Sequence, residues 1–136
     1  MITVKFGGTS LADAQRIRNA AEIIRANPER RFVVVSAPGK RSPEDIKITD
    51  LLIRFQTSGD PKDFAPIEER FEEIIRELGI DLDLSADYAE MKNEPHNISL
   101  SLYILSALDS LVIRLFCISR DSPIAADACR TRDAVF

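Results

Sequence analysis

The sequence predicts an α/β fold built on a parallel sheet, and three observations indicate it. A short apolar run at residues 2–6 ends at two glycines, as a strand ends at a turn. Apolar residues then recur every three or four positions to about residue 26, which is the pattern of an amphipathic helix. A second run at 32–37 is apolar without alternation over its first four residues, as in a strand covered on both faces. Strand, helix and strand in this order form a right-handed βαβ unit.

Length, composition and charge indicate one folded domain. The chain has 136 residues, of which 45% are hydrophobic and 29% charged, values typical of a globular protein. The 18 basic and 22 acidic side chains give a net charge of -4, which leaves no excess of positive charge for a nucleic-acid partner. The chain opens directly into its first strand without the pattern of a signal peptide, so we expect a cytoplasmic location.

The first helix is predicted over about residues 11–26. Ser10 can accept a hydrogen bond as its N-cap, and Asp13, three residues later, supplies the acidic partner of a capping box. The apolar stripe ends near Asn27-Pro28, where proline stops a helix.

Three more helices are predicted after the second strand. A polar loop comes first at 38–43, because its prolines and glycine forbid regular structure. A short helix then contains the apolar positions of 48–55, and a longer one runs from 63 to 78, with Gly79 as its C-terminal cap. A fourth helix is predicted from Ser85, as N-cap, to residue 94, before Pro95.

The cysteines and the histidine give no sign of a metal site. Cys117 and Cys129 lack the paired spacing or neighbouring histidines of a zinc site, so we interpret them as free thiols. His96 follows Pro95 in a polar stretch and has no second histidine or cysteine as a co-ligand. We therefore expect an exposed loop histidine and no metal held by the chain's own side chains.

The composition changes near residue 97, which divides the chain into residues 1–96 and a divergent tail, 97–136. The last forty residues contain no glycine, lysine or glutamate. Apolar positions over 100–118 predict one helix with a core-facing side. A membrane-spanning helix is the alternative, but Asp109 and Arg114 would lie inside it at a cost of a few kcal/mol each.

The residues that suggest chemistry lie where the first strand turns into the first helix, at Lys5-Phe6-Gly7-Gly8-Thr9-Ser10. Adjacent glycines let a ligand approach the backbone closely, and the N-terminus of the next helix presents unpaired amides that favour phosphate. A lysine before the turn can reach the same phosphates and offset the charge that develops in phosphoryl transfer. The segment matches neither the P-loop nor the dinucleotide fingerprint. Taken alone, a tight turn is the simpler interpretation.

Three segments in order resemble the aspartate kinases, which belong to the amino acid kinase family. They are residues 5–10, the second-strand segment Val33-Val34-Val35-Ser36-Ala37-Pro38-Gly39-Lys40, and Ile48-Thr49-Asp50-Leu51-Leu52. The resemblance covers roughly residues 1–95 and implies an open three-layer αβα sandwich, here incomplete and with a helix-rich second half. Kinases of the same fold act on N-acetylglutamate, glutamate, carbamate or UMP, and Thr9-Ser10 together with Ile48-Thr49-Asp50 favours aspartate among them.

The resemblance implies transfer of the γ-phosphoryl group of ATP, with Mg²⁺, to the side-chain carboxylate of L-aspartate, a step in the biosynthesis of lysine and related amino acids. By matching position, Lys5 would contact the transferring phosphoryl group as the catalytic residue. Lys5, Gly7, Gly8, Thr9 and Ser10 would hold the nucleotide phosphates. Ser36 and Thr49 would lie near the substrate, although a strand-end hydroxyl and a helix cap explain these two residues equally well.

The tail departs from the family's pattern. The family carries a Ser-x-Gly-Glu motif whose glutamate helps to bind aspartate, and the nearest match is Ser106-Ala107-Leu108-Asp109, which makes Asp109 a candidate substrate ligand. The family also continues for well over a hundred further residues. Two hypotheses follow. The chain is a truncated or frame-altered kinase fragment without useful activity, or it is a non-catalytic association module that forms a homodimer by covering an incomplete sheet edge.

Overall fold

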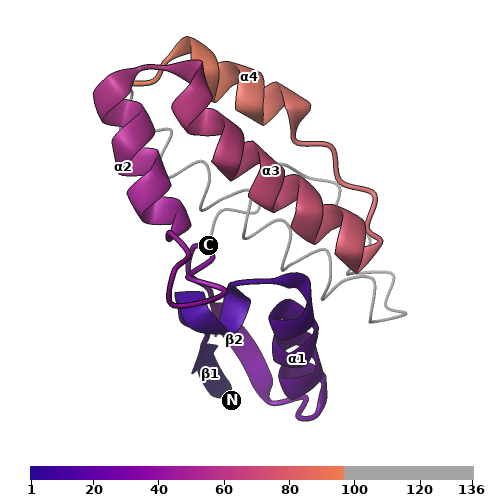
Figure 1. The fold of residues 1–136 in the computed structure, drawn as a ribbon. Helices are drawn as coiled ribbons and strands as arrows, with labels where there is room; N and C mark the ends of the chain where they lie inside the picture. Colours follow the sequence, from indigo (N-terminus) through magenta and orange to yellow (C-terminus); the bar gives the residue numbers. More distant parts are fainter. Residues whose placement is uncertain (97–136) are drawn as a thin grey trace.

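A computed structural model describes residues 1–96, which form a pair of parallel strands and a set of helices (Figure 1). The strands, η1 and α1 lie together at one end, and α2, α3 and α4 lie side by side at the other. The predicted α/β class is confirmed. In chain order the elements are β1 (Ile2–Lys5), the 3-10 helix η1 (Gly8–Leu11), α1 (Ala14–Arg25), β2 (Arg30–Val34), α2 (Ile48–Ser58), α3 (Pro61–Leu78) and α4 (Ser85–Asn93).

The two strands are parallel and joined by α1, as the βαβ prediction requires. Lys5 pairs with Val34 at the carboxyl end of the ladder, and the amide of Phe6 extends it by donating to the Val34 carbonyl at 2.8 Å. Because the strands are parallel, the segments that leave them emerge at the same edge of the sheet.

The second strand differs from its prediction in position and in burial. It spans Arg30–Val34 rather than 32–37, and Phe32 and Val34 are 51% and 47% exposed. Val33, between them, packs against the core. Successive side chains of a strand point to opposite faces, and within residues 1–96 only one of these faces is covered. An apolar run therefore did not establish burial on both sides.

The first helix begins later than predicted, and its cap is a different residue. A 3-10 turn closes first, because the Ser10 amide donates to the Gly7 carbonyl at 3.0 Å. Asp13 is extended, with φ -151° and ψ 172°, and its side chain accepts from the Arg16 amide at 2.9 Å. Asp13 is thus the N-cap of α1, and the capping box led by Ser10 is wrong.

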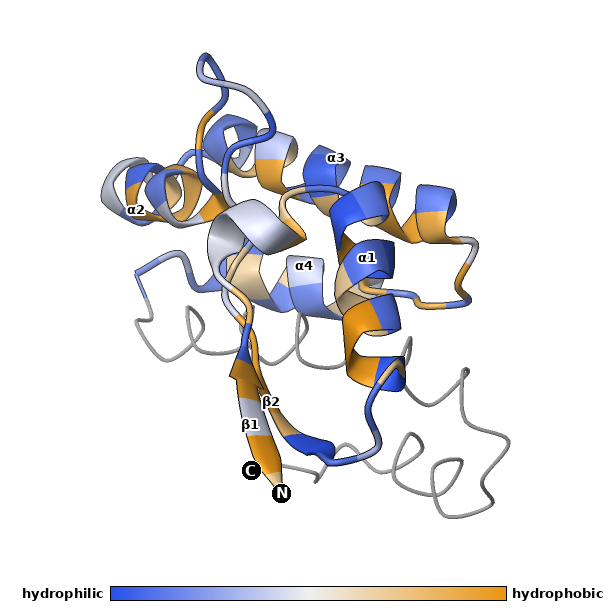
Figure 2. Cartoon of the chain, turned by 90° about the horizontal axis from the view of Figure 1, so that it is seen from below, coloured by the Kyte–Doolittle hydropathy of each residue, from blue (hydrophilic) through white to orange (hydrophobic). Residues whose placement is uncertain are grey.

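The helices form one core through their apolar stripes. Figure 2 shows apolar residues recurring along one side of α3. The rings of Phe55 and Phe64 lie 5.0 Å apart, and Tyr88 of α4 meets Phe64 at 5.9 Å. Gly79 ends α3 with φ 68°, as predicted. Ser85 is not the cap of α4, because Leu84 occupies that position.

No helix within residues 1–96 is long and apolar enough to cross a membrane. The helix predicted over 100–118 and its candidate ligand Asp109 lie outside the described residues.

Candidate functional site

The segments that follow the two strands are hydrogen-bonded to each other at the carboxyl edge of the sheet. The Gly39 amide donates to the Gly8 carbonyl at 2.8 Å, and the amide of Ile48, the first residue of α2, donates to the Pro38 carbonyl at 3.2 Å. The glycine turn, the loop after β2 and the start of α2 therefore meet at one place. In open α/β sheets, ligands bind at this edge.

The two glycines of the turn have different surroundings. A methyl group on Gly8 would lie 2.9 Å from the Ala37 carbonyl oxygen and 3.2 Å from the Gly39 Cα. One on Gly39 would lie 2.7 Å from the Gly8 carbonyl carbon. At Gly7 a methyl group would meet nothing within 4 Å. Gly8 and Gly39 thus let two backbones touch, whereas Gly7 borders open space.

The predicted nucleotide residues lie together on the surface of this turn. Lys5, Gly7, Thr9 and Ser10 are exposed, and Phe6 between them is buried at 8% exposure. Within residues 1–96 no ion pair engages the Lys5 ammonium. A lysine and small polar residues thus surround an open stretch of backbone, which is an arrangement suited to an anion.

The predicted substrate residues border the same place. Ser36 is half-buried and directly precedes Ala37, whose carbonyl faces Gly8. Thr49 is exposed on the first turn of α2, where Lys47 is the N-cap. The helix-cap explanation of Thr49 is therefore wrong.

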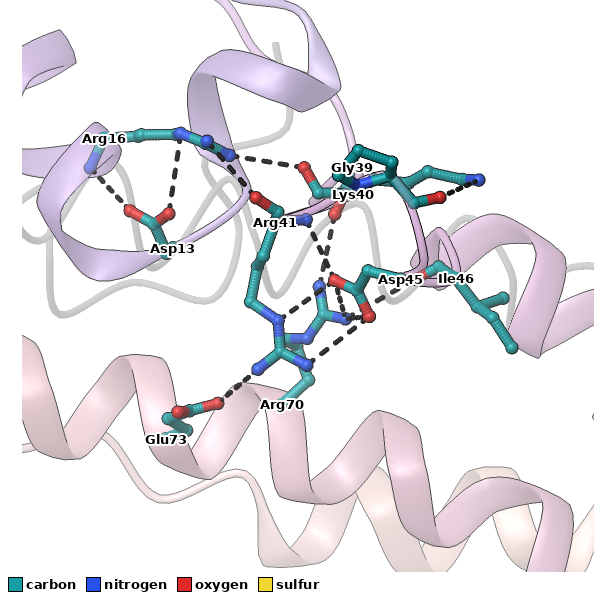
Figure 3. Close-up of polar contacts among 10 residues, drawn as sticks. Asp13, Arg16, Gly39, Lys40, Arg41, Asp45, Ile46, Arg70 and Glu73 are labelled. Atoms are coloured by element: carbon teal, nitrogen blue, oxygen red, sulfur yellow. Dashed lines mark hydrogen bonds and ion pairs between the residues drawn. The ribbon is translucent and has the colours of Figure 1, made fainter.

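Sequence reasoning missed Arg70, which lies in α3 and contacts the loop after β2 (Figure 3). It is 4% exposed and lies in the helix's buried stripe, three residues after Ile67 and four before Ile74. Its Nη1 donates to the Gly39 carbonyl at 3.2 Å, and its Nη2 lies 2.7 Å from each carboxylate oxygen of Asp45. A charged residue at an apolar position of a helical stripe was the signal that would have identified it.

A network of charges surrounds Asp45. Arg41 pairs with the Asp45 carboxylate at 3.0 Å. Arg41 also pairs with Glu73 of α3, at 2.7 Å. Burial alone would raise the pKa of Asp45. Hydrogen bonds from Arg41, one from the Ile46 backbone and the charge of Arg70 outweigh burial and hold that pKa well below its usual range. Arg41 is therefore paired with two carboxylates although its side chain remains exposed.

Residues 1–96 contain no group of three or more histidine, cysteine, aspartate or glutamate side chains placed to hold a metal ion.

Comparisons with known proteins identify relatives of one kind. Aspartokinase 3 of Bacillus subtilis (strain 168) is 42% identical over 83 residues, which are 57% of this chain and 18% of that protein. The chloroplastic bifunctional aspartokinase/homoserine dehydrogenase 2 of Arabidopsis thaliana is 37% identical over 105 residues, 72% of this chain and 11% of that protein. The chain thus spans less than a fifth of these relatives.

A solved structure matches the fold. The crystal structure of Clostridium acetobutylicum aspartate kinase superposes with a TM-score of 0.76 at 29% identity, over 88% of this chain and 30% of that one. The resemblance to aspartate kinases and the predicted fold class are thereby confirmed. The model of the amino acid kinase family matches residues 1–133. On these grounds, this chain belongs to the amino acid kinase family.

Proposed function

We propose that this chain carries the phosphate-binding part of an aspartate kinase, and that the turn at residues 5–10 receives the phosphates of ATP. The observation that carries this proposal is the contrast between the two glycines. Gly8 is locked against Gly39, whereas Gly7 is open beside the exposed Lys5. A fixed backbone with one open approach and an adjacent exposed cation is suited to a phosphate chain.

Each residue of the site has a role in this proposal. The Lys5 ammonium offsets negative charge on the transferring phosphoryl group, while the backbone of Gly7 and Gly8 and the hydroxyls of Thr9 and Ser10 hold the other phosphates. Mg²⁺ arrives with the nucleotide and neutralises charge between its phosphates. Ser36 and Thr49 border the turn and orient L-aspartate, for which Asp109 is a further candidate.

Phosphoryl transfer requires both substrates to be held in line. Because the chain spans 18% and 11% of two curated relatives, we propose that these 136 residues alone bind nucleotide but transfer phosphate poorly. As part of an enzyme of amino acid biosynthesis, including that of lysine, the chain would act in the cytoplasm. Aspartate-dependent release of ADP in a coupled assay would contradict the proposal of poor transfer.

Titration with Mg-ATP tests the proposed function. We expect saturable binding by isothermal calorimetry, lost in Lys5→Ala and kept in Lys62→Ala, which removes an exposed lysine from the first turn of α3. Equal binding by both variants would contradict the role of Lys5. Concentration-dependent dimerisation without nucleotide affinity would favour the association module instead, with the exposed Phe32 and Val34 as its apolar contacts.

A further inference from the structure

We propose that Arg70 is a positioning residue that holds the loop 39–46 against the glycine turn and so fixes the backbone that receives phosphate. The identity of the ligand rests on the proposed function. The proposal that Arg70 holds the loop rests on contacts within residues 1–96.

One guanidinium joins both ends of this loop (Figure 3). At the beginning of the loop, Arg70 donates to the Gly39 carbonyl at 3.2 Å. At its end, Nη2 binds both oxygens of Asp45 at 2.7 Å and lies 3.4 Å from the Ile46 carbonyl. The planar fork of an arginine can make such divergent contacts at once, whereas a lysine ammonium is a single point.

Gly39 transmits this restraint to the turn. Its carbonyl accepts from Arg70, and its amide donates to the Gly8 carbonyl at 2.8 Å. The hydrogen bonds that connect α3 to the glycine turn therefore pass through Gly39, whose carbonyl and amide are both engaged. Arg16 of α1 supports the loop from another element by donating to the Lys40 carbonyl at 3.2 Å.

The burial of Arg70 supports a positioning role over a purely stabilising one. Arg70 is the one buried charged residue within residues 1–96, at 4% exposure. Buried ion pairs are often no more stable than apolar residues of similar volume, because desolvation offsets the attraction between the charges. An apolar residue would fill this position of the α3 stripe, but it would leave the Gly39 carbonyl without its side-chain donor and the loop without the contact that joins its two ends.

Two substitutions separate positioning from stability. Arg70→Met keeps most of the buried volume and removes every contact to the loop, while Arg41 still pairs with Asp45. Arg70→Lys keeps the charge beside Asp45 but cannot bridge Asp45 and Gly39 together. Arg54→Met is the control for removing an arginine from an ion pair elsewhere, since the exposed Arg54 of α2 pairs with Asp63 of α3 at 2.8 Å.

The decisive measurement is amide exchange at Gly39 by NMR, together with the Kd for Mg-ATP. In Arg70→Met we expect Gly39 to exchange at least about tenfold faster and Mg-ATP to bind at least about tenfold more weakly. The buried amides of α2 and α3 should remain protected. Arg70→Lys should give smaller changes of the same sign, and Arg54→Met none.

Several results would overturn the proposal. Wild-type exchange at Gly39 in a folded Arg70→Met would show that Arg70 does not hold the loop, and if that variant does not fold, the same result in Arg70→Lys would decide. Faster exchange with an unchanged Kd would refute the link to phosphate binding. If the wild-type chain binds no Mg-ATP, the proposed function fails, and exchange at Gly39 still decides whether Arg70 positions the loop.

Discussion

Exchanging each glycine of the turn for alanine should separate packing from ligand access. In Gly8→Ala the new methyl group would lie 2.9 Å from the Ala37 carbonyl oxygen and 3.2 Å from the Gly39 Cα. Ordinary contacts of this kind are about 3.4 Å or more, and both neighbours are backbone atoms that cannot rotate away, so the loop must shift by several tenths of an ångström. Overpacking of this degree costs about 1–3 kcal/mol.

Gly7→Ala is the matched comparison. Gly7 has φ -78° and ψ 170°, which any residue adopts, and its methyl group would meet nothing within 4 Å. The free energy of unfolding of Gly7→Ala should therefore be unchanged, or raised by about 0.4–1 kcal/mol because alanine lowers the conformational entropy of the unfolded chain. The methyl group would, however, occupy the approach to the turn, so we expect weaker Mg-ATP binding with full stability.

Urea unfolding followed by circular dichroism measures the loss of folding stability expected in Gly8→Ala. Calorimetric titration measures the weaker Mg-ATP binding expected in Gly7→Ala. Equal stability losses in the two variants would refute the reasoning, because it assigns the close backbone approach to Gly8 alone. Full Mg-ATP affinity in Gly7→Ala would refute the assignment of the open approach.

Three further predictions concern the cap of α1, the carboxylate of the loop after β2 and the contact between α4 and α3. Asp13→Ala should lower the free energy of unfolding in urea by about 0.5–2 kcal/mol, because Asp13 caps α1. Ser10→Ala should lower it by much less, and a larger loss in Ser10→Ala than in Asp13→Ala would support Ser10 as the cap. Because the pKa of Asp45 is lower in the folded than in the unfolded chain, its ionised form stabilises the fold above about pH 4, and this contribution is lost as the pH falls further. Melting temperature should thus depend less steeply on pH between about 2 and 4 in Asp45→Asn than in the wild type, and parallel curves would contradict this. Tyr88→Phe should cost about 0.5–1.5 kcal/mol in urea unfolding by removing the 3.0 Å hydrogen bond to Glu72, and an unchanged midpoint would show that water replaces that contact.

Local patterns in the sequence predicted most of the elements but not their exact starts. The spacing of apolar residues located α1, α2 and α3, and Gly79 located the end of α3, because these signals lie within one element. The start of α1 was misplaced because Ser10 and Asp13 are both good caps. Only the 3-10 turn, held by the Ser10 amide on Gly7, assigns that role to Asp13.

The candidate site was proposed from contiguous residues at 5–10 and from single positions matched to a family, and its residues stay predictions. Residues 5–10 were proposed because a lysine at the end of a strand is followed by two glycines and two hydroxyls, and the strand predicts where they lie. The role of Gly39 was not predicted, because its closest contact is with Gly8, on a segment far away in the sequence. Likewise, the apolar run at 32–37 indicated a strand without indicating how many of its faces are covered.

The arginines near the turn explain why lysines are the cations available to a ligand there. Arg70 and Arg41 are both engaged by Asp45, and Arg16 is engaged by Asp13 at 3.5 Å and by loop carbonyls. An arginine already held by carboxylates offers little charge to a third group, because part of its field is neutralised and its donors are occupied. Lys5, Lys40 and Lys47, by contrast, are exposed and have no ion pair within residues 1–96, and Lys5 lies on the strand that leads into the glycine turn. The arginines therefore shape the backbone of the site, and the exposed lysines, Lys5 nearest the glycines in sequence, are left to supply its charge.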